Sequence, residues 1–234
     1  MPLSDLLAPV QLDRTRQAAP QVFETLRTAI VSLVLPPGTV LSRNELADHF
    51  GLSQTPVRDA LMRLGEEALV DVFAQHATVV SRIDVTAAVQ SHFLRRALEL
   101  ELVRELCGQT ADLRQALALQ LRQHLAAQEA ALQAGRHDAF MQADADFHAA
   151  MFHAAGMAEL LQLVRRRGGH VERLRRLHLP APGKAQTVLG DHARLMANLA
   201  EGDADAARAT LRQHLAGTLT FVEDVRLRHP DWVR

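Results

Sequence analysis

The chain has 234 residues, and its 26 Lys or Arg residues nearly balance its 27 Asp or Glu residues. This length is enough for two domains of ordinary size. Its single cysteine, Cys107, excludes an intrachain disulfide. No apolar run approaches the ~20 residues that a membrane-spanning helix needs. The composition therefore predicts a cytoplasmic protein that does not enter the membrane.

The N-terminal segment, residues 1–19, lacks the basic start and apolar core of a signal peptide, and we expect it to be a flexible arm. Residues 22–35 carry apolar side chains at helical spacing and predict the first helix. The sequence PPG at 36–38 ends this helix, because proline cannot continue the hydrogen-bond ladder.

Residues 41–70 predict two short helices joined by a tight turn and followed by a strand. Ala47 lies where the two helices must approach closely, and Gly51 supplies a left-handed turn. Val57 packs the second helix back onto the first. Ser53 is suited to cap that helix through its hydroxyl, and Pro56 lies in its first turn, where a missing N–H costs nothing. This is the helix-turn-helix pattern.

The polar side chains at the start of the second helix are suited to phosphates and base edges in a major groove. Between residues 20 and 83 five arginines face seven acidic residues, so charge alone argues against DNA binding. Few phosphate contacts per copy also imply that strong binding needs two copies. The candidate DNA-binding residues of this region are Arg43, Asn44, Ser53, Gln54, Thr55 and Arg58.

Residues 69–83 are rich in β-branched side chains and predict two short strands, which would form a wing. His76 is the one sizeable polar residue near the predicted tip of this wing. We add it to the candidate DNA-binding residues. The winged helix-turn-helix would therefore span residues 20–83.

From Asp84 onward no strand pattern occurs, and residues 84–228 predict an all-α antiparallel bundle of about six helices, with a tail at 229–234. The expected helices cover residues 85–107, 112–134, 137–155, 157–177, 185–200 and 204–227. We expect most of the arginines in the runs at 165–167 and 173–176 to form a solvated face or a dimer rim rather than a DNA-binding patch. The fold class is thus mainly α.

Four residues of the bundle are candidate metal ligands. Asp144 and His148 are four residues apart, so they share one helix face, which points inward. His192 and His214 each lie in an apolar stripe of a later helix. One carboxylate and three imidazoles that converge would bind a divalent transition metal. A single inward histidine is more often a core residue bonded to a neighbour, so the pattern alone leaves both interpretations open.

The stretch LSRNELADHFGLSQTPVRDALMRLGEEALV at 41–70 resembles the winged helix of the GntR family of bacterial transcriptional regulators. The sequence DADFHAAMFHAAG at 144–156 is similar to the D-x-x-x-H helix of the FadR-type branch, which carries an FCD domain. Residues 190–215 resemble the paired-histidine segment of that domain. The family usually has glycine where this chain has Ala68 and Ala77, and arginine in place of Phe73. These departures put minor-groove contact by the wing in doubt.

The resemblance implies that Asp144, His148, His192 and His214 bind a divalent metal, which in turn helps to hold a small carboxylate. Zinc and nickel suit an imidazole-rich site, and the carboxylate also admits manganese. The resemblance further implies that Arg95 reaches into the ligand cavity. The alternative for Arg95 is an ion pair within its own helix, with Glu99 four residues later.

We therefore expect a ligand-responsive transcription factor that acts as a repressor. It would bind palindromic double-stranded operator DNA as a homodimer. Its effector would be a small organic acid. An enzyme with a hydrolytic metal is the competing class, but no further carboxylate stands out as a general base. A regulator of the acyl-coenzyme A type is the third alternative, and members of that type lack the metal residues as a set.

Overall fold

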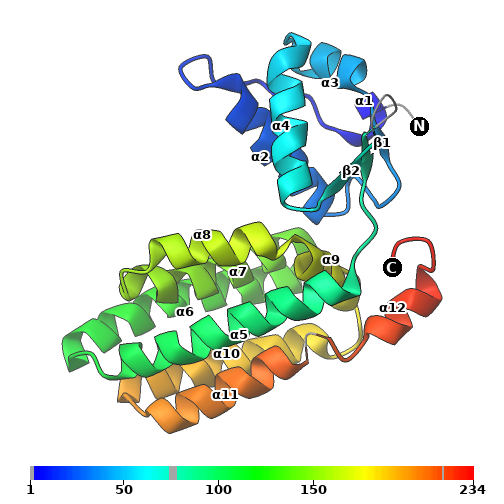
Figure 1. Cartoon of the computed structure of the whole chain (residues 1–234). Helices are drawn as coiled ribbons and strands as arrows, with labels where there is room; N and C mark the ends of the chain where they lie inside the picture. The colour runs from blue at the N-terminus through cyan, green and yellow to red at the C-terminus, as the bar shows by residue number, and fades with distance from the viewer. Residues whose placement is uncertain (1–2, 74–77, 218) are drawn as a thin grey trace. The chain divides into compact units, whose positions relative to one another are not determined.

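The computed structural model describes residues 3–73, 78–217 and 219–234 (Figure 1). The chain divides into two compact units. The N-terminal unit contains Met1–Val85 together with Arg226–Arg234, and the helical unit contains Thr86–Val225. No helix of the described residues is both long enough and apolar enough to cross a membrane.

The N-terminal unit is a winged helix-turn-helix, as predicted. Its strands form an antiparallel sheet in the order β1-β3-β2, with Val40 opposite Val79 and Val70 opposite Val80. The first strand was not predicted, since two residues carry no recognisable pattern. The elements are α1 (Leu3–Leu6), α2 (Ala18–Val31), β1 (Val40–Leu41), α3 (Arg43–Phe50), α4 (Gln54–Glu66), β2 (Val70–Val72) and β3 (Thr78–Val80).

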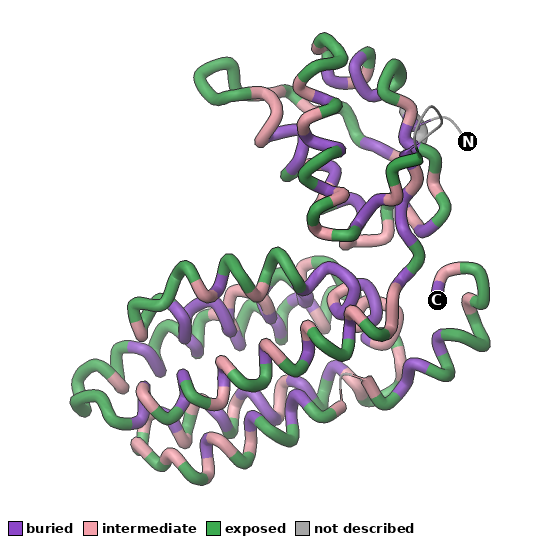
Figure 2. The backbone as a smooth tube through the Cα atoms, in the orientation of Figure 1, coloured by how far each residue is buried: buried purple, intermediate pink, exposed green. Residues whose placement is uncertain are grey.

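The helix-turn-helix is built from the residues that the sequence indicated. Gly51 ends α3 with a left-handed backbone at φ 63°, and Val57 is fully buried. Ser42 caps α3 by accepting a hydrogen bond from the Glu45 N–H. The capping prediction for Ser53 is wrong in part, because this residue precedes α4 but its hydroxyl makes no capping hydrogen bond. The core of this unit is visible as buried backbone in Figure 2.

Both ends of the chain make contacts within the N-terminal unit. The first residues, which we expected to form an arm, place Leu3 and Leu7 in the core, because one helical turn brings these two leucines onto the same face. At the other end, Val233 forms a parallel β-bridge with Ile83. The Ile83 N–H donates to the carbonyl of Trp232 at 2.7 Å. The α2 helix also begins earlier than predicted, with Pro20 in its first turn.

The helical unit is an antiparallel bundle in which α6 packs along α7 and α10, and α11 packs along α10 (Figure 1). Two predicted helices are each divided in the structure, one at Gly168 and one after Gly217, because glycine weakens a continuous helix. The elements are α5 (Val85–Cys107), α6 (Ala111–Gln133), α7 (His137–Ala154), α8 (Ala158–Arg167), α9 (Gly169–His178), α10 (Lys184–Glu201), α11 (Ala204–Ala216) and α12 (Val222–Arg228).

Helix α7 is the helix on which the candidate site depends. Phe147, Met151 and Phe152 are at most 1 % exposed and join the main core of the helical unit. Because α7 is covered on several sides, side chains that would normally face water are enclosed within the bundle. Asp144 and His148 lie on this covered helix, at 1 % and 4 % exposure.

Candidate metal centre and DNA-binding surface

Three helices bring the predicted metal ligands together. Asp144 and His148 come from α7, His192 from α10 and His214 from α11. Each offers one ligand atom, and these atoms all lie within 4.8 Å of one another. The α10–α11 hairpin aligns the two later histidines, because Gly202 ends α10 at φ 79° and α11 then runs back along it.

The three imidazole rings lie close to one another, and an aromatic side chain packs on one of them. The ring centroids of His192 and His214 lie 4.6 Å apart, and that of His148 lies 5.2 Å and 5.3 Å from these two. Phe147 stacks on His192 at 4.1 Å with an interplanar angle of 4°. This stacking fixes the plane of the His192 ring and keeps water from one face of it.

Several atoms at this centre are buried without a hydrogen-bond partner among the described residues. Among them are Oδ1 of Asp144, Nε2 of His148 and Nε2 of His192. The Asp144 and His192 atoms lie 3.7 Å apart. Leaving one such polar atom unsatisfied costs about 1–3 kcal/mol. A shared divalent ion would satisfy all three, and imidazole nitrogen with carboxylate oxygen is a ligand set that transition metals accept. The residues therefore fit a metal.

Each histidine also has a polar neighbour on the side away from the centre. Nδ1 of His192 lies 2.8 Å from Oε1 of Gln128, and Nδ1 of His148 lies 3.0 Å from Oε2 of Glu99. Nδ1 of His214 lies 3.5 Å from a carboxylate oxygen of Asp191. An amide oxygen only accepts, so the proton of His192 is on Nδ1 and the lone pair of Nε2 faces the centre.

Sequence analysis missed two of these three neighbours and noted Glu99 only as a partner of Arg95. One signal for Asp191 was available, because this aspartate directly precedes His192 in the chain. Gln128 lies 64 residues from His192 and gave no comparable signal.

Burial and charge set the protonation states at this centre. Burial, together with the charge of His214, lowers the pKa of His192 well below its usual value. Burial also lowers the pKa of His214, although the hydrogen bond with Asp191 opposes this shift. Burial alone would raise the pKa of Asp144, but the Arg175 guanidinium and nearby histidines hold it well below the usual range. An ionised aspartate and neutral histidines are the forms that coordinate a metal.

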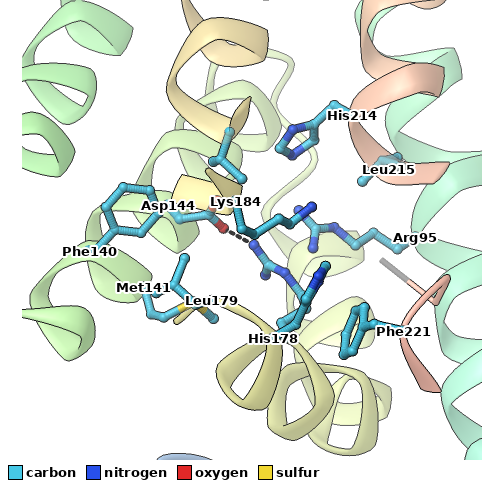
Figure 3. Close-up of a pocket in the computed structure, with 12 residues that line it drawn as sticks. Arg95, Phe140, Met141, Asp144, His178, Leu179, Lys184, His214, Leu215 and Phe221 are labelled. Carbon is cyan, nitrogen blue, oxygen red and sulfur yellow. Dashed lines mark hydrogen bonds and ion pairs between the residues drawn. The ribbon is translucent and has the colours of Figure 1, made fainter. Parts of the chain in front are cut away.

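A cavity lies directly beside the candidate metal centre (Figure 3). Its cavity volume is about 30 Å³, and the space around it, open solvent included, is about 430 Å³. Asp144 and His214 belong to both the cluster and the cavity wall, so a small molecule in the cavity would contact the centre. The remaining lining residues are Arg95, Phe140, Met141, Arg175, His178, Leu179, Lys184, Val188, Leu215 and Phe221.

Arg95 satisfies both interpretations that the sequence left open. Its Nε donates to Oε1 of Glu99 at 2.6 Å, and the side chain also lines the cavity. The expectation of a solvated face was wrong for the run at 173–176, in which Arg173 is fully buried. The Arg175 side chain is only 13 % exposed and pairs with Asp144 and Glu172. Acidic partners on α7 and α9 stabilise this guanidinium away from bulk water.

The candidate DNA-binding residues lie on α3, on the turn that follows it and at the start of α4, and all six described ones are exposed. Gln54 donates to Oδ1 of Asn44 at 2.5 Å, which links the two helices at this surface. Arg58 has an aspartate neighbour, Asp59, at 3.4 Å. His76 lies outside the described residues.

A winged helix-turn-helix followed by a helical bundle that encloses a His/Asp cluster is the architecture of a DNA-binding transcriptional regulator. Family models agree with this assignment: residues 18–80 match "Bacterial regulatory proteins, gntR family" and residues 90–217 match "FCD domain". The chain belongs to the GntR family of bacterial transcriptional regulators and carries an FCD domain. It is a regulator and not an enzyme.

Relatives extend along nearly the whole chain. An HTH-type regulator from the unstable DNA locus of Streptomyces ambofaciens is 33 % identical over 219 residues, covering 90 % of this chain and 87 % of its own. The Escherichia coli K12 repressor RspR is 27 % identical over 95 % of this chain and 96 % of its own. The solved structure of E. coli McbR/YncC has a TM-score of 0.77 at 21 % identity, over 89 % and 98 % of the chains, and so supports the fold.

Proposed function

We propose that this regulator is a metal-dependent repressor that senses a small carboxylate. It binds palindromic operator DNA as a homodimer, and the effector binds at the metal centre of the helical unit. The observation that supports this most is the convergence of unpartnered ligand atoms from Asp144, His148 and His192 beside a cavity rich in cations. The DNA partner places its action in the cytoplasm.

The metal would be bound by Asp144, His148, His192 and His214. Zinc and nickel match three imidazoles, and manganese is the alternative that the carboxylate admits. With a single carboxylate among its ligands, a divalent ion keeps a net positive charge. An anionic oxygen from an effector would neutralise that charge and take a coordination position that the protein leaves open.

The cavity supplies the remaining recognition of a carboxylate. Arg95 and Arg175 line it, and guanidinium groups are the natural bidentate partners of carboxylates. Apolar side chains such as Phe140 and Leu215 cover the rest of the wall, which limits access of water and strengthens these ionic contacts. A small organic acid therefore fits better than an amine or a neutral sugar.

The DNA-binding mode rests on the exposed residues Arg43, Asn44, Ser53, Gln54, Thr55 and Arg58, with His76 as a further candidate. Few cations per copy favour a dimer, in which two helix-turn-helix units contact two half-sites. RspR is named a repressor, and so is the gluconate operon regulator of Bacillus subtilis, which matches 32 % of this chain. The effector would act by shifting the relative placement of the two DNA-binding units.

Two measurements test the metal and the effector. Elemental analysis of dialysed protein should find about one divalent ion per chain, as a four-ligand site predicts. The His148→Ala, His192→Ala double variant should lose this ion, and equal metal content in the native protein and the variant would exclude these ligands.

A thermal-shift screen of organic acids, amines and neutral sugars should give hits among acids only. Those hits should vanish with chelator, and an acid hit that survives chelation would place the effector elsewhere.

A further inference from the structure

Lys184 is the single lysine of a chain with 26 cationic residues, and it lies at the cavity. It is the first residue of α10, directly after Gly183, which adopts a left-handed backbone at φ 77°. The other cations of the chain are arginines. The one lysine ammonium of the chain therefore lies at the wall of the proposed effector site.

The two arginines that line the cavity each form an ion pair, and Lys184 differs from them among the described residues. Arg95 pairs with Glu99 at 2.6 Å, and Arg175 pairs with Asp144 and Glu172. No ion pair or hydrogen bond joins the Lys184 side chain to any residue that the structure describes. Burial, and then the charge of Arg175, lower the pKa of Lys184, although the charges of Asp191 and Asp144 oppose this shift.

The direction of this side chain matters for the ligand. Figure 3 shows Lys184 and Arg95 extending into the cavity from opposite sides, with Asp144 and His214 at other points of the wall. An anion between these cations would supply the counterion that Lys184 lacks. A single carboxylate bound at the metal centre would not also form an ion pair with Lys184.

We propose that Lys184 is a second anion-binding group of the cavity, so that the effector is a short diacid with one carboxylate at the metal centre and the other at Lys184. The inference rests on the proposed function and narrows its ligand class. Apolar residues of the wall, such as Met141 and Leu179, would cover the carbon chain between the two acid groups. Lys184 then determines specificity, since an ammonium without an anionic partner disfavours a monoacid.

The test compares acids that differ by one carboxylate on the full-length, metal-loaded protein. Succinate is matched with butyrate, and malate with 2-hydroxybutyrate, because in each pair a methyl group replaces the second carboxylate. By calorimetric titration the diacid should bind about tenfold or more tightly than its partner, the worth of one charge-assisted contact. Lys184→Met should abolish this preference. Lys184→Arg should retain part of it.

Arg122→Met is the matched control, since it removes one positive charge from an exposed position on α6. It should leave the diacid preference intact. If it reduces the preference as much as Lys184→Met does, the effect reflects net charge and the inference fails.

The single lysine permits a direct second measurement. Reductive methylation with carbon-13 labels only Lys184 and the N-terminal amine, and the methylated amine remains cationic. Succinate should move the Lys184 NMR signal, which is assigned by its absence in Lys184→Arg, and butyrate should leave it in place. A signal that neither acid moves would overturn the contact even if Lys184→Met fails to fold.

The outcomes separate this inference from the proposed function. If no acid binds with or without metal, the proposed function itself fails. If acids bind in a metal-dependent way but succinate and butyrate bind equally, the proposed function stands and the role of Lys184 is excluded. If inorganic phosphate competes better than succinate does, the second group is not a carboxylate and the diacid assignment is overturned.

Discussion

Gln128 offers the sharpest test of how the bundle orients the candidate metal ligands. This residue is fully buried on α6, and its Oε1 lies 2.8 Å from Nδ1 of His192. Gln128→Leu keeps the volume roughly constant and removes the acceptor. His192 would then lose the contact that keeps its proton on Nδ1 and its Nε2 lone pair toward the centre. We expect weaker metal binding.

Two opposing effects set the magnitude. The variant leaves Nδ1 of His192 without a partner, which costs about 1–3 kcal/mol in a buried site. It also removes Nε2 of Gln128, which is itself buried without a partner and carries a similar penalty in the native protein. The free energy of unfolding of the metal-free protein should therefore change little. Metal affinity has no such compensation and should fall by about 10–100-fold, or roughly 1.4–2.7 kcal/mol.

The assay is a competition titration of zinc between the protein and a chromogenic chelator, with urea unfolding of the metal-free protein in parallel. Gln123→Leu makes the same chemical change at an exposed position of α6 and serves as the control. Native zinc affinity in Gln128→Leu, with unfolding unchanged, would refute the idea that Gln128 orients His192. An equal loss of affinity in Gln123→Leu would show that the effect is not local to the site.

Three further predictions concern DNA, the wing and pH. Arg58→Ala should weaken specific operator binding by about 1–3 kcal/mol if this exposed arginine contacts a base, and full affinity in a mobility-shift titration at fixed salt would exclude that role. Ala68→Gly should raise the free energy of unfolding in urea by about 0.5–1 kcal/mol. The reason is that Ala68 has φ 56°, a backbone conformation that is strained for alanine. A lower free energy of unfolding in the variant would contradict this. Because His192 and His214 have lowered pKa values, the unfolded chain binds more protons. The melting temperature of the metal-free protein should therefore fall as pH drops below about 6.5, the pKa of histidine in the unfolded chain. A melting temperature that stays constant from pH 7 to 5 would refute this.

Local sequence was sufficient for those features whose determinants lie within one or two helical turns. The left-handed turn at Gly51 and the small side chain of Ala47 identified the helix-turn-helix, and the structure confirms the turn and buries Ala47. The four-residue spacing of Asp144 and His148 placed the two side chains on one helix face in the same way. Helix ends were less certain, and the predicted helices that span Gly168 and Gly217 are each divided in the structure.

Contacts between distant segments could only come from the tertiary structure. Arg175 lies in an arginine-rich run that looks solvent-exposed, yet Asp144, 31 residues earlier, draws it into the bundle. Gln128 and Lys184 carry no local signal, because burial depends on which helices pack against them. The sequence by itself determined which side chains could bind a metal, since ligand chemistry belongs to the residue. Which atoms lack a partner, and which cation faces the cavity, was decided by helix packing, because that packing alone determines which groups water can no longer reach.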